Sequence, residues 1–209
     1  VAAGYTLLPL DKSKIAKKQA LASIGQSLLM ETYRRNFNKY YIICSQILLE
    51  ASDLKDKTCL KNTKNTIDEL LKNNVVPIIN ENDVTAIDEL VFGDNDQLAA
   101  HVALHFNASL LVILTDIDGY YDDNPKTNKN AKLQKIVNFI SDDELNKKYS
   151  ANSEFATGGI VTKLKAAHFL MQNNLNMYLS SGFDLVNAKE YLLEKNHIGG
   201  TLFTKDTNV

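Results

Sequence analysis

The 209-residue sequence contains no tryptophan, only three prolines and only two cysteines, Cys44 and Cys59. Two cysteines without CxxC spacing exclude a disulfide-rich scaffold and favour a reduced, cytoplasmic setting. No apolar run approaches about 18 residues, so we expect no membrane-spanning helix, and the N-terminus has no signal-peptide pattern. Lysine and arginine number 23 against 25 acidic residues, a net charge of −2. This balance gives no indication of a nucleic-acid or membrane partner.

The residues that are present, 44% of them hydrophobic, are enough for one sizeable core. Helix-like and strand-like patterns alternate along the chain, and "SDDE" (141–144) has the capping-box pattern of a helix start. The expected helices cover 13–37, 65–74, 96–106, 141–149, 162–174 and 188–197, and the expected strands cover 40–49, 75–80, 109–116, 176–182 and 199–203. Buried strands that alternate with helices predict an α/β fold, with a mostly parallel sheet covered on both faces.

Small polar clusters follow three of the expected strands. They are "NEND" (80–83), "TDIDG" (115–119) and "SSG" (180–182), and "GDND" (93–96) precedes a helix. Ligands in open α/β sheets bind beyond the carboxyl ends of the strands, so we expect one shared polar rim. Asp96 has two readings: a ligand-binding residue, or the N-cap of its helix.

A glycine pair precedes the helix in "FATGGIVTKLKAA" (155–167), whose first turn holds Thr162 and Lys163. Glycines let backbone amides approach a phosphate, and a helix N-terminus favours anions. Lys163 adds a cation for a phosphoryl oxygen. The pattern is not a Walker A loop, and a plain glycine turn before a helix remains an alternative.

Other readings of the polar residues are weaker. "LVILTDIDG" is similar to the first motif of haloacid-dehalogenase-type phosphatases, with Asp116 as nucleophile and Asp118 as acid. That motif usually opens the fold, and it leaves "NEND" and "GDND" without a role. A calcium loop at Asp116 and Asp118 lacks its third acidic position, and His101 and His105 lack the glutamate of HExxH. We therefore expect no protein-held metal.

The order of these motifs resembles the glutamate 5-kinases of the amino acid kinase family. The resemblance rests on "VVPIINENDVTAIDELVFGDNDQLAAHVA", "LLVILTDIDGYYDDNPKTN" and "ATGGIVTKLKAA", with "ALASIGQSLL" (20–29), "LSSGFD" and "GGTLF" in support. It covers nearly the whole chain. "NEND" and "GDND" are its most specific parts, whereas "LTDIDG" is shared with acetylglutamate, aspartate and uridylate kinases.

The resemblance implies an αβα sandwich around a largely parallel sheet of about eight strands. It implies transfer of the ATP γ-phosphoryl group to the side-chain carboxylate of L-glutamate, the first step of proline biosynthesis. Asn80, Asp83 and Asn95 would bind glutamate, Asp96 would orient lysines, and Lys163 would stabilise the transferring charge. The nucleotide-binding residues would be Thr115, Asp116, Thr157, Gly158, Gly159, Ile160, Val161, Thr162 and Lys163. Mg²⁺ would be held through the phosphates.

The resemblance also implies features at the ends of the domain. Members begin with a Lys-x-Gly-Ser strand and a Ser-rich turn, and many end in a PUA domain. We expect residues 1–209 to form one amino acid kinase domain without these parts, N-terminally truncated and nearly inactive alone. A cytoplasmic homo-oligomer with proline as feedback inhibitor is expected. The alternatives are another kinase of the family and a non-catalytic ligand-binding remnant.

Overall fold

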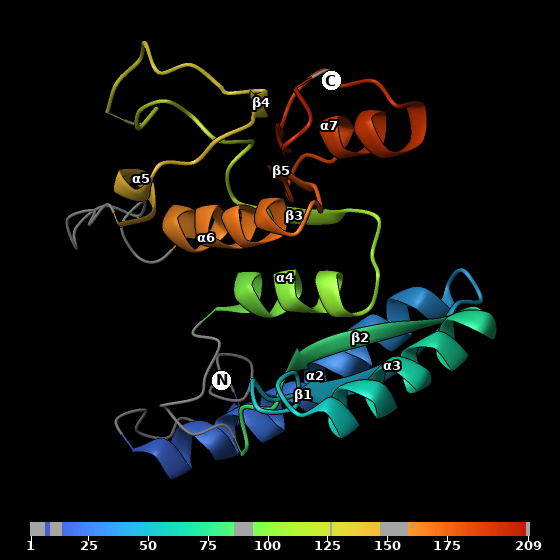
Figure 1. Cartoon of the computed structure of the whole chain (residues 1–209). Coiled ribbons are helices and arrows are strands. Elements are labelled where there is room, and N and C mark those ends of the chain that lie inside the picture. The colour runs from blue at the N-terminus through green and yellow to red at the C-terminus, as the bar shows by residue number, and fades with distance from the viewer. Residues whose placement is uncertain (1–6, 9–13, 86–93, 126, 147–158, 208–209) are drawn as a thin grey trace. The chain divides into compact units, whose positions relative to one another are not determined.

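A computed structural model describes residues 7–8, 14–85, 94–125, 127–146 and 159–207 (Figure 1). The chain divides into two compact units, Val1–Leu98 and Ala99–Val209. The division falls within helix α4 (Asn95–His105). No helix in the described ranges is both long enough and apolar enough to cross a membrane.

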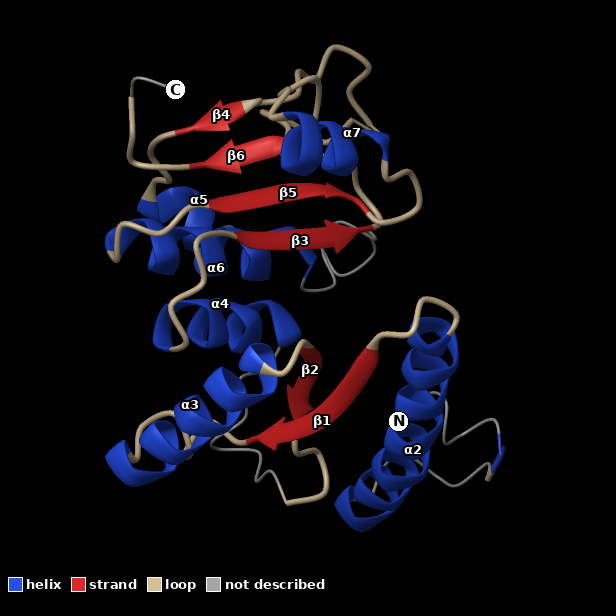
Figure 2. Cartoon of the chain, turned by 90° about the vertical axis from the view of Figure 1, so that its right-hand side faces the viewer, coloured by secondary structure: helices blue, strands red, loops and turns tan. Residues whose placement is uncertain are grey.

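The first unit is built on two parallel strands, β1 (Ile43–Leu49) and β2 (Val75–Glu81). Helices α2 (Ile15–Asn38) and α3 (Lys57–Lys72) lie on opposite sides of this pair (Figures 1 and 2). Asp56 caps α3, because its carboxylate accepts from the amides of Thr58 and Cys59 at 2.9 and 2.7 Å. Pro77 lies within β2, whose one strand partner in the described part of this unit is β1.

The second unit contains a four-stranded sheet in the order β3-β5-β6-β4. These strands are β3 (Leu111–Thr115), β4 (Ile136–Val137), β5 (Met177–Ser181) and β6 (Thr201–Phe203). The β3–β5 and β4–β6 pairs are parallel, whereas β5 and β6 are antiparallel. The sheet is therefore mixed, with one antiparallel junction in its middle.

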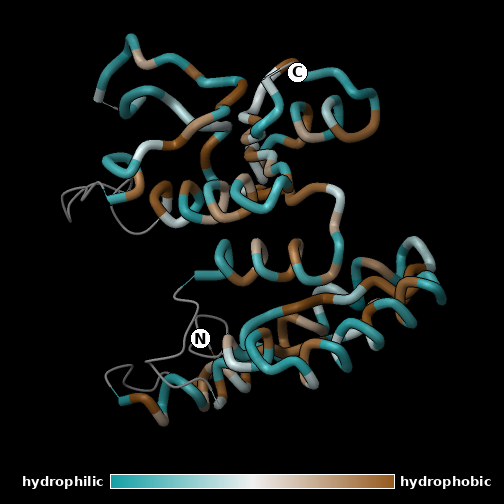
Figure 3. Tube along the Cα trace, viewed as in Figure 1, coloured by the Kyte–Doolittle hydropathy of each residue, from teal (hydrophilic) through white to brown (hydrophobic). Residues whose placement is uncertain are grey.

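Alternating side chains of β5 serve two different cores. Met177 and Leu179 pack with α4 and with helix α6 (Gly159–Gln172) on one face. Tyr178 packs on the other face with Ala188 of α7 (Val186–Lys189) and with Tyr191 of the π-helical turn η1 (Glu190–Glu194). Helices thus cover both faces of this sheet, as expected for an αβα sandwich. Hydrophilic and hydrophobic residues alternate along the helices (Figure 3).

Asparagines end three of the helices. Asn74, Asn107 and Asn174 all have left-handed φ angles of 57–58° and follow α3, α4 and α6. Asparagine tolerates this conformation better than most residues, so it stops a helix and redirects the chain into the next strand. This local chemistry explains why the helix-to-strand boundaries are visible in the sequence.

The alternation of elements expected from the sequence is confirmed, with three differences. Helix α3 begins at Lys57, eight residues before the expected start at 65. The two-residue strand β4 was not predicted: the sequence indicates a long polar loop at 120–132 and assigns residues 133–137 to no element. The expected helix at 188–197 is instead the short helix α7 followed by η1. Lys195, the C-cap of η1, has a left-handed φ of 55°. Helix α5 (Asp142–Asn146) begins at the predicted capping box: Ser141 Oγ accepts from the Glu144 amide, and Glu144 Oε2 accepts from the Ser141 amide.

Candidate functional site

The carboxyl ends of β3 and β5 form a polar edge in the second unit. Thr115 pairs with Ser181 in the parallel ladder, and the Gly182 amide donates to the Thr115 carbonyl at 2.7 Å. Thr115 Oγ1 donates to Asp116 Oδ1 at 3.0 Å, and the Asp116 side chain is exposed. The predicted clusters after these two strands therefore lie together, with a carboxylate open to solvent.

The polar loop beyond β3 has its own internal bonding. Tyr121 Oη donates to Asp118 Oδ2 at 3.0 Å. Burial and then this contact raise the pKa of the Tyr121 hydroxyl above its ordinary value. Gly119 is buried, and a Cβ there would collide with the Leu133 side chain and approach Thr201 Oγ1 to 2.9 Å. Close packing therefore favours glycine at position 119.

Helix α6 supplies the second part of the candidate nucleotide site. It begins at Gly159, and Ile160 is buried in the apolar core, so only the backbone of Ile160 is available to a ligand. Thr162 Oγ1 and Lys163 Nζ both donate to the Gly159 carbonyl, each at 3.1 Å. A Cβ on Gly159 would meet nothing within 4 Å, so the surface beside this residue is open. The predicted residues Thr157 and Gly158 lie outside the described residues.

The position of Lys163 concentrates positive charge at the start of α6. Lys163 is only 9% exposed, and its Nζ is directed back to the Gly159 carbonyl. Lys163 is the fifth residue of α6, and its bond to the Gly159 carbonyl brings the ammonium group back to the helix start, where the helix dipole opposes a cation. A bound anion would offset this repulsion. The arrangement is thus suited to a phosphate group.

In the first unit, the end of β2 carries the "NEND" cluster. Asn80 Nδ2 donates to Gln26 Oε1 at 3.0 Å, and Asp83 is exposed in the turn that follows. Glu81 is buried and pairs in register with Leu49. Thr85 Oγ1 donates to Glu50, which ties the turn to the end of β1. Asp83 is therefore exposed to solvent, and the Asn80 amide is held by Gln26.

The start of α4 corrects one reading of Asp96. The capping residue is Asp94: its Oδ1 accepts from the Asp96 amide at 3.0 Å, and its carbonyl accepts from the Gln97 amide at 3.1 Å. Asn95 and Asp96 are the first two residues of the helix. Asp96 is therefore not the N-cap, because the residue two positions earlier already fills that role.

Each unit thus contains some of the predicted site residues. The second unit places Thr115 and Asp116 at the β3–β5 edge and carries Lys163 on α6; the first unit carries Asn80, Asp83, Asn95 and Asp96. Sequence reasoning missed the Gln26 contact with Asn80. Gln26 lies in "ALASIGQSLL", a segment that supports the family resemblance. Sequence spacing alone does not show which strand a helix residue faces.

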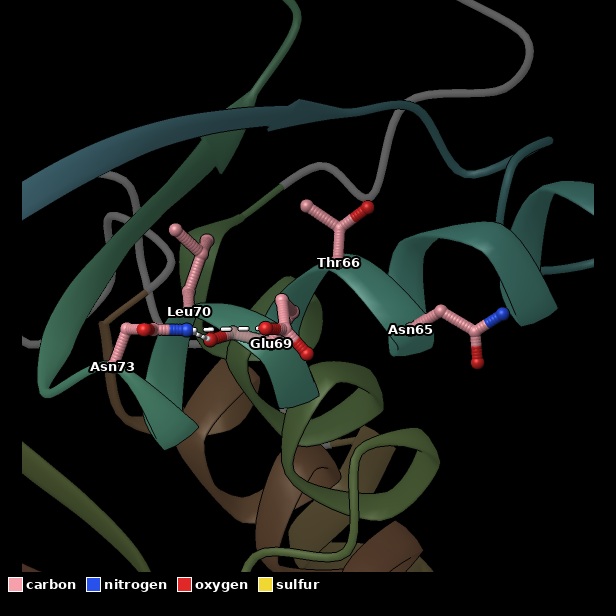
Figure 4. Close-up of a pocket in the computed structure, with 5 residues that line it drawn as sticks. All are labelled: Asn65, Thr66, Glu69, Leu70 and Asn73. Carbon is pink, nitrogen blue, oxygen red and sulfur yellow. Dashed lines mark hydrogen bonds between the residues drawn. The ribbon is translucent and has the colours of Figure 1, made fainter.

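A separate pocket of about 560 Å³ lies along α3 (Figure 4). Its lining residues are Asn65, Thr66, Glu69, Leu70 and Asn73. Asn73 Nδ2 donates to the Glu69 carbonyl and to Glu69 Oε1 at 2.8 and 3.1 Å, so part of the polar lining is already internally bonded. No predicted site residue that the structure describes lines this pocket. Across the described residues, no group of three or more His, Cys, Asp or Glu side chains is placed to hold a metal ion.

Comparison with known proteins identifies the class. A sequence model of the amino acid kinase family matches residues 3–181, and the chain belongs to this family. Among solved structures, an isopentenyl phosphate kinase from T. acidophilum has the same fold, with a TM-score of 0.60 at 17% identity over 95% of this chain and 77% of that one. The family assignment does not support the phosphatase reading of Asp116 and Asp118.

Curated relatives narrow the class to one enzyme. A glutamate 5-kinase of Leishmania donovani is 55% identical over 203 residues, which cover 97% of this chain and 77% of the relative. A glutamate 5-kinase of Wolinella succinogenes is 51% identical over 209 residues, which cover 98% of this chain and 80% of the relative.

Proposed function

We propose that the protein phosphorylates the side-chain carboxylate of L-glutamate with ATP, giving γ-glutamyl phosphate for proline biosynthesis. The observation that carries this proposal is the 55% identity to a glutamate 5-kinase over nearly the whole chain. The polar residues described above supply suitable chemistry for such a reaction. They include acceptors for an amino group in the first unit and an anion-binding helix start in the second.

The proposed reaction needs positioning and charge neutralisation more than a general base. A glutamate side chain has a pKa near 4.3, so it is already a carboxylate at neutral pH. One carboxylate oxygen forms a bond to the γ-phosphorus, and the bond from that phosphorus to the bridging oxygen breaks, leaving ADP. The protein must align these groups and offset the negative charge on the phosphoryl oxygens.

We assign the substrate roles by residue chemistry. Asp83 carries a negative charge for the glutamate α-ammonium, and Asn80 and Asn95 offer amide groups for its polar atoms. Asp96, in the first turn of α4, is assigned to orient lysines that act on the phosphoryl group. These assignments place the amino-acid specificity in the first unit.

The nucleotide roles fall on the second unit. Thr115 and Asp116 contact the nucleotide, and residues 157–163 surround the ATP phosphates, with Lys163 stabilising the transferring charge. Lys163 Nζ would exchange its bond to the Gly159 carbonyl for one to a phosphoryl oxygen. Mg²⁺, held through oxygens of the triphosphate, would offset part of the remaining charge. We further propose a cytoplasmic homo-oligomer that proline inhibits.

The test is an acceptor comparison with the full-length protein and MgATP. Hydroxylamine traps an acyl phosphate as a hydroxamate, so glutamate should give γ-glutamyl hydroxamate and ADP in equal amounts. Phosphorylation of aspartate or uridylate but not glutamate would favour another kinase of the family. Binding of MgATP without turnover of any of these acceptors would favour a non-catalytic ligand-binding protein.

A further inference from the structure

Three amide side chains from separate elements of the first unit form a hydrogen-bonded chain. Gln26 of α2 donates from Nε2 to Gln46 Oε1 of β1 at 3.2 Å. The same Gln26 accepts through Oε1 from Asn80 Nδ2 of β2 at 3.0 Å. The inner bond is partly buried, whereas the outer bond to Gln46 is exposed. Gln26 therefore connects a helix to the strand end that carries a candidate substrate residue.

The local sequence explains how Gln26 reaches both strands. Ala22 and Gly25 are buried on α2, and small side chains let a helix approach a strand closely. Gln46 precedes Leu48 by two residues, and Leu48 pairs with Asn80. Because side chains two apart project from the same face of a strand, Gln46 and Asn80 lie on one face of the β1–β2 pair. Gln26 lies over that face.

The direction of the chain decides what Asn80 offers a ligand. An asparagine amide has an acceptor oxygen and a donor nitrogen, and hydrogen bonding selects which end faces which partner. With Nδ2 directed at Gln26, Asn80 keeps Oδ1 as an acceptor for N–H groups. A reversed amide would present N–H donors, which repel an ammonium group and attract a carboxylate.

We infer that Gln26 is a positioning residue for the amino-acid substrate: it holds the Asn80 amide so that Oδ1 accepts from the α-ammonium group. This inference rests on the proposed function, since it assumes that Asn80 contacts glutamate. It adds a residue outside the polar strand ends, and it gives the "SIGQ" segment of α2 a role in specificity. Gln26 acts through Asn80 and does not itself touch the substrate.

The test compares variants of Gln26 by steady-state kinetics in the hydroxamate assay. Gln26→Met has a similar length but no amide acceptor, so it should raise the KM for glutamate about five- to tenfold, the scale of one lost orienting hydrogen bond. The KM for ATP should stay within about twofold. Gln26→Glu retains an acceptor for Asn80 and should restore the KM for glutamate to within about threefold of wild type. Gln46→Met, the matched control, removes only the exposed outer bond and should behave as wild type.

A second variant keeps the test decisive if Gln26→Met folds poorly. Gln26→Lys offers donors only, so it should reverse the Asn80 amide and raise the KM for glutamate at least as much. In the Asn80→Ala background, Gln26→Met should add no further loss, because the partner it positions is gone.

The outcomes separate the two proposals. A wild-type protein that phosphorylates no glutamate overturns the proposed function and this inference with it. An active wild type with an unchanged KM for glutamate in Gln26→Met overturns the positioning role alone. Equal increases in both KM values, or equal losses from Gln26→Met and Gln46→Met, would also overturn it, because they indicate a general structural effect.

Discussion

At the scale of single residues, Lys163 gives the sharpest prediction. Lys163→Met keeps the buried aliphatic stem but removes the ammonium group, so kcat should fall about a hundredfold or more, as expected for the loss of one transition-state charge contact. Lys165→Met, on the same helix but exposed, should leave kcat within about twofold. The measurement is kcat from hydroxamate formation at saturating glutamate and MgATP.

Folding provides the control for this comparison. Lys163→Met also removes the bond to the Gly159 carbonyl, so the melting temperatures of both variants are measured beside kcat. An unchanged kcat in Lys163→Met would remove the residue from the catalytic assignment. A loss of kcat accompanied by a lower melting temperature would instead indicate that Lys163 holds the helix start together.

Residue-level prediction from sequence succeeded for one local pattern, failed for another and missed a distant contact. The Ser141–Glu144 capping box was predictable because its two partners are three residues apart. Asp96 was proposed as a cap, but Asp94 fills that role, since several short polar residues compete at a helix start. The Gln26–Asn80 contact spans 54 positions, so only the folded chain reveals it.

At the scale of elements, the start of α3 gives a pH-dependent prediction. The Cys59 amide, the Cys59 side chain and the Thr58 amide lower the pKa of Asp56 below 3.8. A lowered pKa in the folded state stabilises the fold above pH 3.8, and this contribution is lost as the pH falls through the folded-state value. Asp56→Ala should therefore lower the melting temperature at pH 7, and the difference from wild type should shrink as the pH falls below about 4.

Asp56→Asn is the matched variant for this experiment, because asparagine also caps helices but does not titrate. Thermal unfolding followed by circular dichroism between pH 7 and about pH 3 measures all three proteins. Asp56→Asn should recover most of the loss in Asp56→Ala at pH 7. A gap between wild type and Asp56→Asn that widens toward acid would contradict the assigned role of the charged cap.

Helices and strands were predictable from the sequence where their hydrophobic residues recur periodically and where a residue at the boundary marks the end of the element. The helices before β2, β3 and β5 all end at an asparagine in a left-handed conformation, which marks the boundary locally. Strand β4 has only two residues, too few for an alternating pattern. Its place in the sheet comes from pairing with β6, and the antiparallel β5–β6 junction is likewise set by tertiary packing.

At the scale of the whole molecule, the proposed substrates are assigned to different units. Glutamate binding is assigned to residues before Leu98, whereas α6, to which phosphate binding is assigned, follows Ala99. The family resemblance assigned both groups of residues, and sequence spacing alone does not determine how segments far apart in the chain are arranged. A whole-molecule test must therefore ask whether each substrate stabilises the protein through its own set of residues.

Ligand-linked stability supplies that test. A ligand at about 100 times its Kd adds about 2.7 kcal/mol to the free energy of unfolding, which raises the melting temperature of a chain of this size by about 5–10 °C. Asp83→Ala should lose the rise caused by glutamate, because the charge that attracts the ammonium group is gone, and should keep the rise caused by MgATP. Asp68→Ala removes another carboxylate of the same unit, one paired with Lys64 at 3.5 Å, and should keep both rises. Differential scanning calorimetry of the three proteins with each ligand measures the shifts. A full glutamate response in Asp83→Ala would place amino-acid binding elsewhere, and loss of both responses would show that Asp83 supports folding more than recognition.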